Sequence, residues 1–223
     1  MNENVIWDFL TKKVGNPFGV AAIMGNLMAE SSLNPANATG KNKTVNYVSD
    51  ADSGNVDFVN DGVAFGLVQW CYRTRKQGLL NYAKSKNTSV GDLTTQLEYL
   101  VKEMSESYKT AWNAVKGATS IRAASDVVML KYEKPAGTSE AAKQKRAAYG
   151  QSFYDKFASG TTPSSDGDTV VITKNNVNIR KGNSKQSKSI CRVQSGEEFE
   201  RIGTKDGWYA IKLWVSGDCA EAR

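Results

Sequence analysis

The sequence predicts an α+β fold, in which a mainly α-helical domain with a small β-wing precedes a small all-β barrel. In the first part of the chain, apolar residues recur at steps of three and four, the period of an amphipathic helix. A polar stretch rich in Asn, Asp and Gly interrupts this pattern at 36–62 and marks the wing. After the polar segment SGTTPSSDG, apolar and polar residues alternate as in strands. We therefore predict domains at 1–158 and 168–223, joined by a linker at 159–167.

The helical domain begins with an apolar stripe that Gly15 and Pro17 close, because both residue types end helices. The stripe consists of Val5, Ile6, Phe9 and Leu10. Ser89 with Asp92 forms a variant of the capping box, which predicts a later helix start. The predicted helices after the first cover about residues 18–31, 72–84, 93–104, 120–132 and 139–157.

The barrel is predicted from five short segments of alternating pattern, separated by Gly, Asn, Lys and Ser. These segments are TVVIT, VNIR, ICRV, EEFERI and GWYAIKL. A domain of roughly 55 residues lies near the lower size limit for a chain that folds alone.

The composition restricts the chemistry, because the chain has no histidine and three cysteines. Serine–histidine and cysteine–histidine nucleophilic sites and histidine-ligated zinc sites are excluded. We therefore expect no metal and no cofactor, and we assign any catalysis to carboxylates. Cys71 is predicted to be a small core residue, whereas a disulfide between Cys191 and Cys219 is left open.

The net charge of +6 suits a polyanionic partner such as nucleic acid, anionic lipid or a wall that carries teichoic acids. No dense Lys/Arg block is present, so nucleic acid is not the expected partner. No segment approaches the ~18 apolar residues of a membrane span, so we expect no membrane insertion. Glu3 and Asp8 stand where a signal peptide is positive, so we expect synthesis in a cytoplasm without a signal peptide. The oligomeric state is left open.

One carboxylate interrupts an apolar helix face. Val20, Ile23, Leu27 and Glu30 follow one another at steps of three, four and three, which places them on one face. Pro35 disfavours helix just before it, so Glu30 lies near the helix C-terminus. Burial and the helix macrodipole both favour the protonated carboxyl there, the form that a general acid needs. The alternative is that the last turn rotates and leaves Glu30 solvated.

The string AESSLNP, followed by DGVAFGLVQW, resembles the lysozyme superfamily of goose-type lysozymes, lytic transglycosylases and phage tail lysozyme domains. The wider strings GVAAIMGNLMAESSLNP and FGLVQWCYRTRKQGLL are most similar to the phage tail lysozyme domain, over about residues 4–157. The resemblance implies that Glu30 protonates a glycosidic oxygen, that Gln69 lines the sugar cleft and that Gly66 lets the backbone approach the substrate. The alternative for Gly66 and Gln69 is a turn and a solvated helix start.

A second carboxylate would hold a water or attack the anomeric carbon. The candidates are Asp50, Asp52, Asp57 and Asp61. Goose-type enzymes place an Asp shortly before their Phe-Gly-Leu-x-Gln motif, and Asp61 lies almost there, one residue closer. This makes Asp61 the predicted base, with a plain Asp-Gly turn as the alternative. Many transglycosylases lack a second acid and use the N-acetyl group of the substrate.

The segment VNIRKGNSKQSKSICRVQSGEEFERIGTKDGWYAIKL resembles a bacterial Src-homology-3-like wall-binding domain. The matching positions are Asn178, Arg180, Gly196, Gly207 and Trp208. The resemblance implies wall-binding roles for Trp208, Tyr209 and Trp214, with the filling of a small barrel core as the alternative.

The two resemblances together imply a phage endolysin, a glycoside hydrolase of the lysozyme or muramidase type. It would cleave the β-1,4 bond between N-acetylmuramic acid and N-acetylglucosamine in peptidoglycan, targeted to a Gram-positive wall by its C-terminal domain. It would act after release from the host cytoplasm or as part of a phage particle. The alternatives are a lytic transglycosylase, an N-acetylglucosaminidase, or a wall-binding phage tail protein with a degenerate lysozyme domain.

Overall fold

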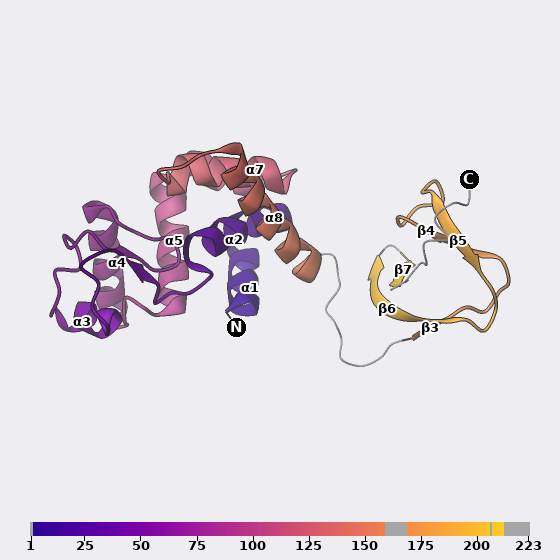
Figure 1. Ribbon diagram of the computed structural model, residues 1–223, viewed down its shortest axis with the longest axis horizontal. Helices are drawn as coiled ribbons and strands as arrows, with labels where there is room; N and C mark the ends of the chain where they lie inside the picture. Colours follow the sequence, from indigo (N-terminus) through magenta and orange to yellow (C-terminus); the bar gives the residue numbers. More distant parts are fainter. Residues whose placement is uncertain (1, 159–168, 206, 212–223) are drawn as a thin grey trace. The chain divides into compact units, whose positions relative to one another are not determined.

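The computed structural model describes residues 2–158, 169–205 and 207–211 (Figure 1). The chain divides into two compact units, Met1–Tyr154 and Asp155–Arg223. The first unit is mainly helical and the second is built from strands, so the predicted α+β class is confirmed. The predicted linker lies outside the described residues. In the described part of the chain, no helix combines the length and apolar character that crossing a membrane requires.

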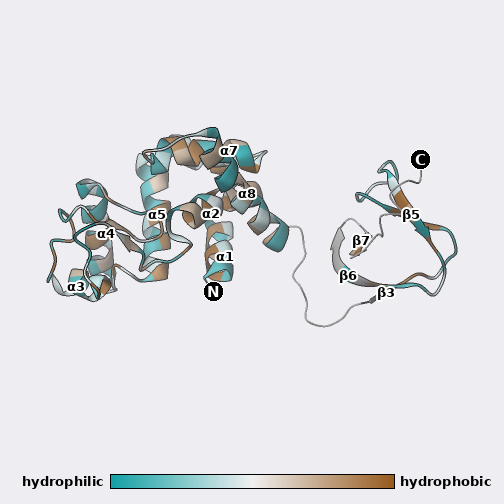
Figure 2. Ribbon diagram, viewed as in Figure 1, coloured by the Kyte–Doolittle hydropathy of each residue, from teal (hydrophilic) through white to brown (hydrophobic). Residues whose placement is uncertain are grey.

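The helical unit is arranged around one buried helix, α2 (Pro17–Ser31), in which every residue from Gly19 to Leu27 is buried. The other helices are α1 (Glu3–Val14), α3 (Tyr47–Ser53), α4 (Arg73–Lys86), α5 (Leu93–Ser107), α6 (Lys109–Lys116), α7 (Ile121–Val128), the π-helix η1 (Met129–Glu133) and α8 (Glu140–Phe157). Helices α1, α6 and α7 pack directly against α2. Hydrophobic and hydrophilic residues alternate along α1 and α5 in Figure 2, as expected for helices that bury one face.

Helix α8 approaches α2 closely at two glycines. A Cβ atom on Gly25 would lie 2.3 Å from the backbone oxygen of Arg146. A Cβ atom on Gly150 would lie 2.8 Å from the backbone oxygen of Ala21. No side chain fits between the two helices at this point, so the glycines fix how near α8 lies to the middle of α2.

The wing contains a two-stranded antiparallel sheet, β1 (Ala38–Thr39) with β2 (Ala64–Phe65). It also contains α3, where the sequence predicted only a loop or a β-wing. Helix α3 buries only Tyr47 and Ala51 among its seven residues. Two buried positions are too few to show a helical period in the sequence.

The predicted helices correspond to α1, α2, α4, α5, α7 with η1, and α8, with two corrections. Asp92 itself caps α5, because its carboxylate accepts a hydrogen bond from the Thr95 backbone N–H at 2.7 Å. Ser89 instead accepts from the Gly91 backbone N–H, so it lies one turn too early to be the cap. Helix α6 was not predicted.

The β unit confirms the five predicted strands. They are β3 (Thr169–Val171), β4 (Val177–Arg180), β5 (Ser189–Val193), β6 (Glu198–Lys205) and β7 (Trp208–Ile211). Strands β3, β6 and β7 form one antiparallel sheet, and β4 pairs antiparallel with β5. Ile172 and Val193 are the buried hydrophobic residues among those described in this unit.

Candidate active site

Glu30 is the penultimate residue of α2, as the sequence predicted. The helix ends there because Ser32 adopts the left-handed conformation, with φ 54°. The Glu30 side chain is 17% exposed, so most of its surface is shielded from solvent. It forms an ion pair with the guanidinium of Arg146, a residue of α8 that the sequence did not single out.

The end of α2 is joined to the predicted Gly-Leu-x-Gln motif by buried hydrogen bonds. The Ser31 hydroxyl donates to the backbone oxygen of Leu67 at 2.9 Å. The Gly66 backbone N–H donates to the oxygen of Asn37 at 2.8 Å, and the Gln69 side-chain amide donates to the same oxygen at 3.2 Å. The two motifs that carried the resemblance therefore lie next to each other.

A glycine is needed at position 66 because the neighbouring side chain of Gln96 leaves no room for a Cβ atom. The φ of Gly66 is 76°, and a Cβ atom there would lie 2.6 Å from the amide oxygen of Gln96 on α5. That amide oxygen accepts from the Leu67 N–H at 2.9 Å, and the amide nitrogen donates to the oxygens of Pro35 and Val90, both at 2.7 Å. Gln96 thus fixes the motif to the segment after α2. The sequence does contain a sign of this role, because Gln96 is a polar residue one turn before Leu100 on the apolar face of α5.

Asp61 lies in the wing with both carboxylate oxygens engaged. One oxygen pairs with the Lys76 ammonium at 2.6 Å and accepts from the Val63 N–H at 2.9 Å. The other accepts from the Tyr47 hydroxyl at 2.5 Å. Burial lowers the pKa of Lys76, and burial together with the Asp61 hydrogen bond raises the pKa of Tyr47. These contacts fasten the wing to α4 and favour a structural role, so the predicted role of Asp61 as base stays a prediction.

The other three aspartates hold local bonds. Asp50 accepts from the Thr44 hydroxyl at 2.5 Å, and Asp52 accepts from the Val90 N–H at 2.8 Å. Asp57 accepts from the side chain of the nearby Asn60. Each of these bonds shapes the wing or its contact with the loop before α5.

A buried carboxylate that the sequence did not reveal is Glu103 of α5. It accepts two hydrogen bonds from Arg75 at 2.7 Å, one from the Trp70 indole at 3.0 Å and one from the Tyr132 hydroxyl at 2.8 Å. Burial and the charge of Glu103 raise the pKa of Tyr132. This cluster connects α4, α5 and η1.

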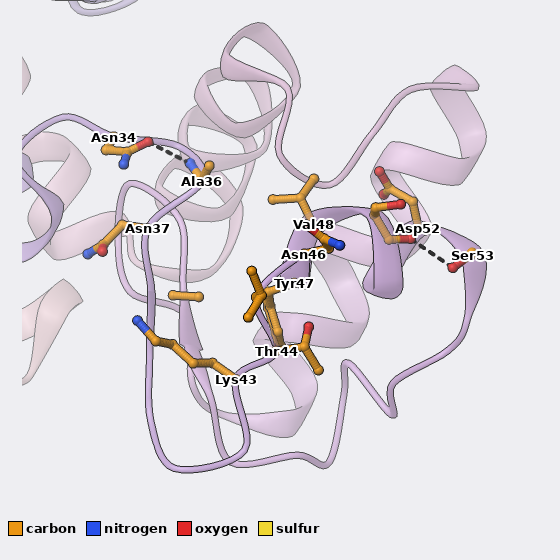
Figure 3. A pocket seen from close by; sticks show the side chains of 13 residues that line it. Asn34, Ala36, Asn37, Lys43, Thr44, Asn46, Tyr47, Val48, Asp52 and Ser53 are labelled. Carbon is orange, nitrogen blue, oxygen red and sulfur yellow. Dashed lines mark hydrogen bonds between the residues drawn. The ribbon is translucent and has the colours of Figure 1, made fainter.

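An open pocket of about 910 Å³ lies between the segment that follows α2 and the wing. Figure 3 shows Asn34 and Asn37 on the first segment, Lys43 and Thr44 on the loop after β1, and Asp52 on α3. Asn37 is the residue whose backbone oxygen binds Gly66 and Gln69. The pocket therefore adjoins the motif that carries the resemblance.

The model of the phage tail lysozyme family matches residues 1–157, which include Glu30, the Gly-Leu-x-Gln motif and α8. The chain belongs to the phage tail lysozyme family. A bacterial SH3 domain model matches residues 175–220. Both resemblances inferred from the sequence are confirmed, and together they support a phage protein that acts on peptidoglycan. A search of curated proteins found no match.

In the SH3 domain, Trp208 is half-buried and Tyr209 is 59% exposed. Both line a cavity of about 470 Å³ together with Asn178 and Arg180. Trp214 lies outside the described residues.

The cysteine predictions have different outcomes. Cys71, in the lysozyme domain, is exposed, so the prediction of a core residue is wrong. It follows the buried Trp70 and precedes α4, at a point where the chain leaves the interior. Cys219 lies outside the described residues, so its pairing with Cys191 stays a prediction.

Proposed function

We propose that this protein is a peptidoglycan hydrolase of the muramidase type, with Glu30 as the general acid for the bond between N-acetylmuramic acid and N-acetylglucosamine. The observation that carries the proposal is the position of Glu30 at the largely buried end of α2, next to Ser31, which bonds the Gly66–Gln69 segment through Leu67. Ser31 and Gln96 hold these two parts together, so the carboxyl has a fixed place from which to reach a bound glycan. A general acid in such a place contributes about 100- to 10,000-fold in rate.

The pocket beside this segment suits a peptidoglycan strand. Asn34 and Asn37 supply amide groups, which bind hydroxyl and N-acetyl groups of sugars. Lys43 supplies a positive charge, which suits the carboxylates of the lactyl and peptide substituents on muramic acid. We propose that the glycan passes through this pocket on its way to Glu30.

The contacts of Asp61 favour a second candidate, a lytic transglycosylase. A hydrolase needs a group that activates water, and both oxygens of Asp61 are already bonded to Lys76 and Tyr47. A transglycosylase needs no water, because a hydroxyl of the substrate closes the anhydro ring. An N-acetylglucosaminidase would use the same acid on the other bond of the glycan.

Product analysis of digested peptidoglycan separates these reactions. A muramidase gives reducing N-acetylmuramic acid ends, a transglycosylase gives 1,6-anhydro ends, and a glucosaminidase gives reducing N-acetylglucosamine ends. We expect reducing muramic acid ends from the full chain. The absence of any glycan product would favour a wall-binding tail protein with a degenerate lysozyme domain.

We further propose that the SH3 domain binds the wall, with Trp208, Tyr209 and Trp214 as contacts and a Gram-positive wall as the target. The exposure of Tyr209 beside a cavity supports this. A chain cut near Ser164 should retain its rate on soluble glycan and lyse whole cells about 100-fold more slowly, because tethering raises the effective concentration. Equal whole-cell lysis by the shortened chain would remove the targeting role.

A further inference from the structure

The hairpin formed by β4 and β5 in the SH3 domain carries charge of one sign. Residues 177–193, which we call the basic hairpin, contain five basic residues and no acidic residue. All of the basic side chains except that of Arg180 are exposed. The five basic residues are Arg180, Lys181, Lys185, Lys188 and Arg192.

The fold brings these charges closer together than they are in the sequence. The Lys181 backbone N–H donates to the backbone oxygen of Lys188 at 3.0 Å, so the two lysines lie opposite each other and continue the register of the β4–β5 pairing. The Arg180 guanidinium donates to the backbone oxygen of Ser187 at 2.8 Å, which holds the loop between the two strands. Cations that polar residues separate along the chain therefore become neighbours across the hairpin.

Nothing within the described part of the chain neutralises this charge. Like charges directly opposite each other destabilise an antiparallel pair. None of the five basic residues forms an ion pair with an acidic side chain among the described residues. Arg192 donates to the side-chain oxygen of Asn178 at 3.3 Å, and this neutral acceptor leaves the positive charge in place. A surface that concentrates positive charge in this way raises the local concentration of anions.

The basic hairpin adjoins the cavity that Trp208 and Tyr209 line. Arg180 and Lys181 line the same cavity of about 470 Å³. A ligand that contacts the exposed ring of Tyr209 therefore lies beside the first cations of the hairpin. The hairpin extends the surface through which the SH3 domain is proposed to bind the wall.

The composition of the hairpin indicates what kind of anion it suits. Three of its five cations are lysines, and an ammonium group on a flexible stem binds as a compact charge without a fixed planar geometry. Such groups suit a flexible polymer that carries charges at intervals. The basic hairpin contains no aromatic residue, so it has no ring on which a nucleic-acid base could stack. A phosphodiester polymer without bases fits both observations.

We propose that the basic hairpin binds the phosphodiester chain of a wall polymer of the teichoic acid type, with Lys181, Lys185 and Lys188 as the contacts. Each ammonium group displaces a small cation from a phosphate, and the release of these cations favours binding at low salt. The polymer is bound at the hairpin, whereas the peptidoglycan contacts remain those of the aromatic cavity. This inference rests on the proposed wall binding by the SH3 domain.

The proposal is tested by titrating the full chain with purified poly(glycerol phosphate) teichoic acid. The affinity should fall about tenfold or more as salt rises from about 50 mM to about 200 mM. The combined variant Lys181→Gln, Lys185→Gln and Lys188→Gln should bind about tenfold or more weakly at the lower salt concentration, with a smaller dependence on salt. An unchanged affinity of this variant would overturn the proposal.

The matched control removes the same charge from the lysozyme domain. It combines Lys12→Gln, Lys109→Gln and Lys131→Gln, three exposed lysines of α1, α6 and η1. This variant should bind the polymer as the wild type does, and both combined variants should keep the melting temperature of the wild type. An equal loss of affinity in the two variants would show that the net charge of the chain is responsible, and would overturn the proposal.

Sedimentation with Gram-positive walls identifies the source of the phosphate. Removal of teichoic acid from the walls should weaken binding of the wild-type chain and leave binding of the hairpin variant unchanged. Equal binding of the wild type to both wall preparations would overturn the proposal, as would a single-stranded oligonucleotide that binds the hairpin as tightly as the polymer does. If the chain binds neither wall preparation, the proposed wall binding fails, whereas the titration still reports whether the hairpin binds a phosphodiester chain.

Discussion

The lysozyme domain and the SH3 domain use polar residues in opposite ways. In the lysozyme domain, Glu103, Lys76 and Gln96 are buried and bonded across helices and loops. In the SH3 domain, most of the described side-chain hydrogen bonds are exposed, such as that between Ser189 and Asn178. Buried networks hold groups in one geometry, which catalysis requires. Exposed polar and aromatic groups suit binding to a repetitive surface.

Asp61→Asn tests the buried network of the lysozyme domain and should cause the largest loss of stability among the variants considered. The change leaves the Lys76 ammonium, which is fully buried, without its carboxylate. Breaking a buried pair by removing one partner costs about 3–5 kcal/mol, so denaturant unfolding should show a loss of this size. The variant Asp57→Asn is the control, because within the described residues the Asp57 carboxylate bonds the exposed Asn60. If Asp61→Asn keeps its stability and loses its activity, Asp61 is the catalytic base that the sequence predicted.

A smaller loss is expected from Gly25→Ala, which tests the close approach of α8 to α2. The added Cβ atom would meet the backbone oxygen of Arg146, and overpacking of this kind costs about 1–3 kcal/mol. Because the strain displaces Arg146 from Glu30, the rate on soluble glycan should fall as well. Gly117→Ala is the control, since its Cβ would lie 3.4 Å from the nearest atom. Equal stability of the two variants would show that a side chain can be accommodated where α8 approaches α2.

The smallest effect on stability is expected from Tyr209→Ala in the SH3 domain. Its side chain is mostly exposed, so unfolding should change by less than about 0.5 kcal/mol. Sedimentation with purified walls should nevertheless show weaker binding, because an exposed aromatic ring supplies contact area. Lys174→Ala serves as a control on an exposed position of the same domain. Unchanged wall binding would place the contact surface elsewhere in the domain.

The two domains also differ in what their sequence could reveal. Gly15, Pro17 and Pro35 mark helix ends through local backbone preferences, and the strands follow from a period of two, so most elements were predictable. Glu30 was visible as a charge on an apolar stripe. Arg146 was not, because the residue that it pairs with lies 116 positions away.

The same reason explains the other residues that the sequence did not reveal. Gln96 reaches Pro35 across 61 positions, and Glu103 reaches Trp70 across 33. A periodic pattern records which face of a helix is buried, but it does not record which distant polar group meets that face. The candidate acid could therefore be predicted, whereas the distant polar groups that bond it and its surroundings required the structure.

The most direct test of the central claim is the cleavage rate of the full-length Glu30→Gln variant on purified peptidoglycan. Glutamine keeps the shape of the side chain and an oxygen that accepts from Arg146, but it has no proton to donate. We predict a fall of about 100- to 10,000-fold in rate, with wall binding and the circular dichroism spectrum unchanged. The variant Glu106→Gln should cleave at the wild-type rate. Cleavage by Glu30→Gln at a rate near wild type would contradict the assignment of Glu30 as the general acid.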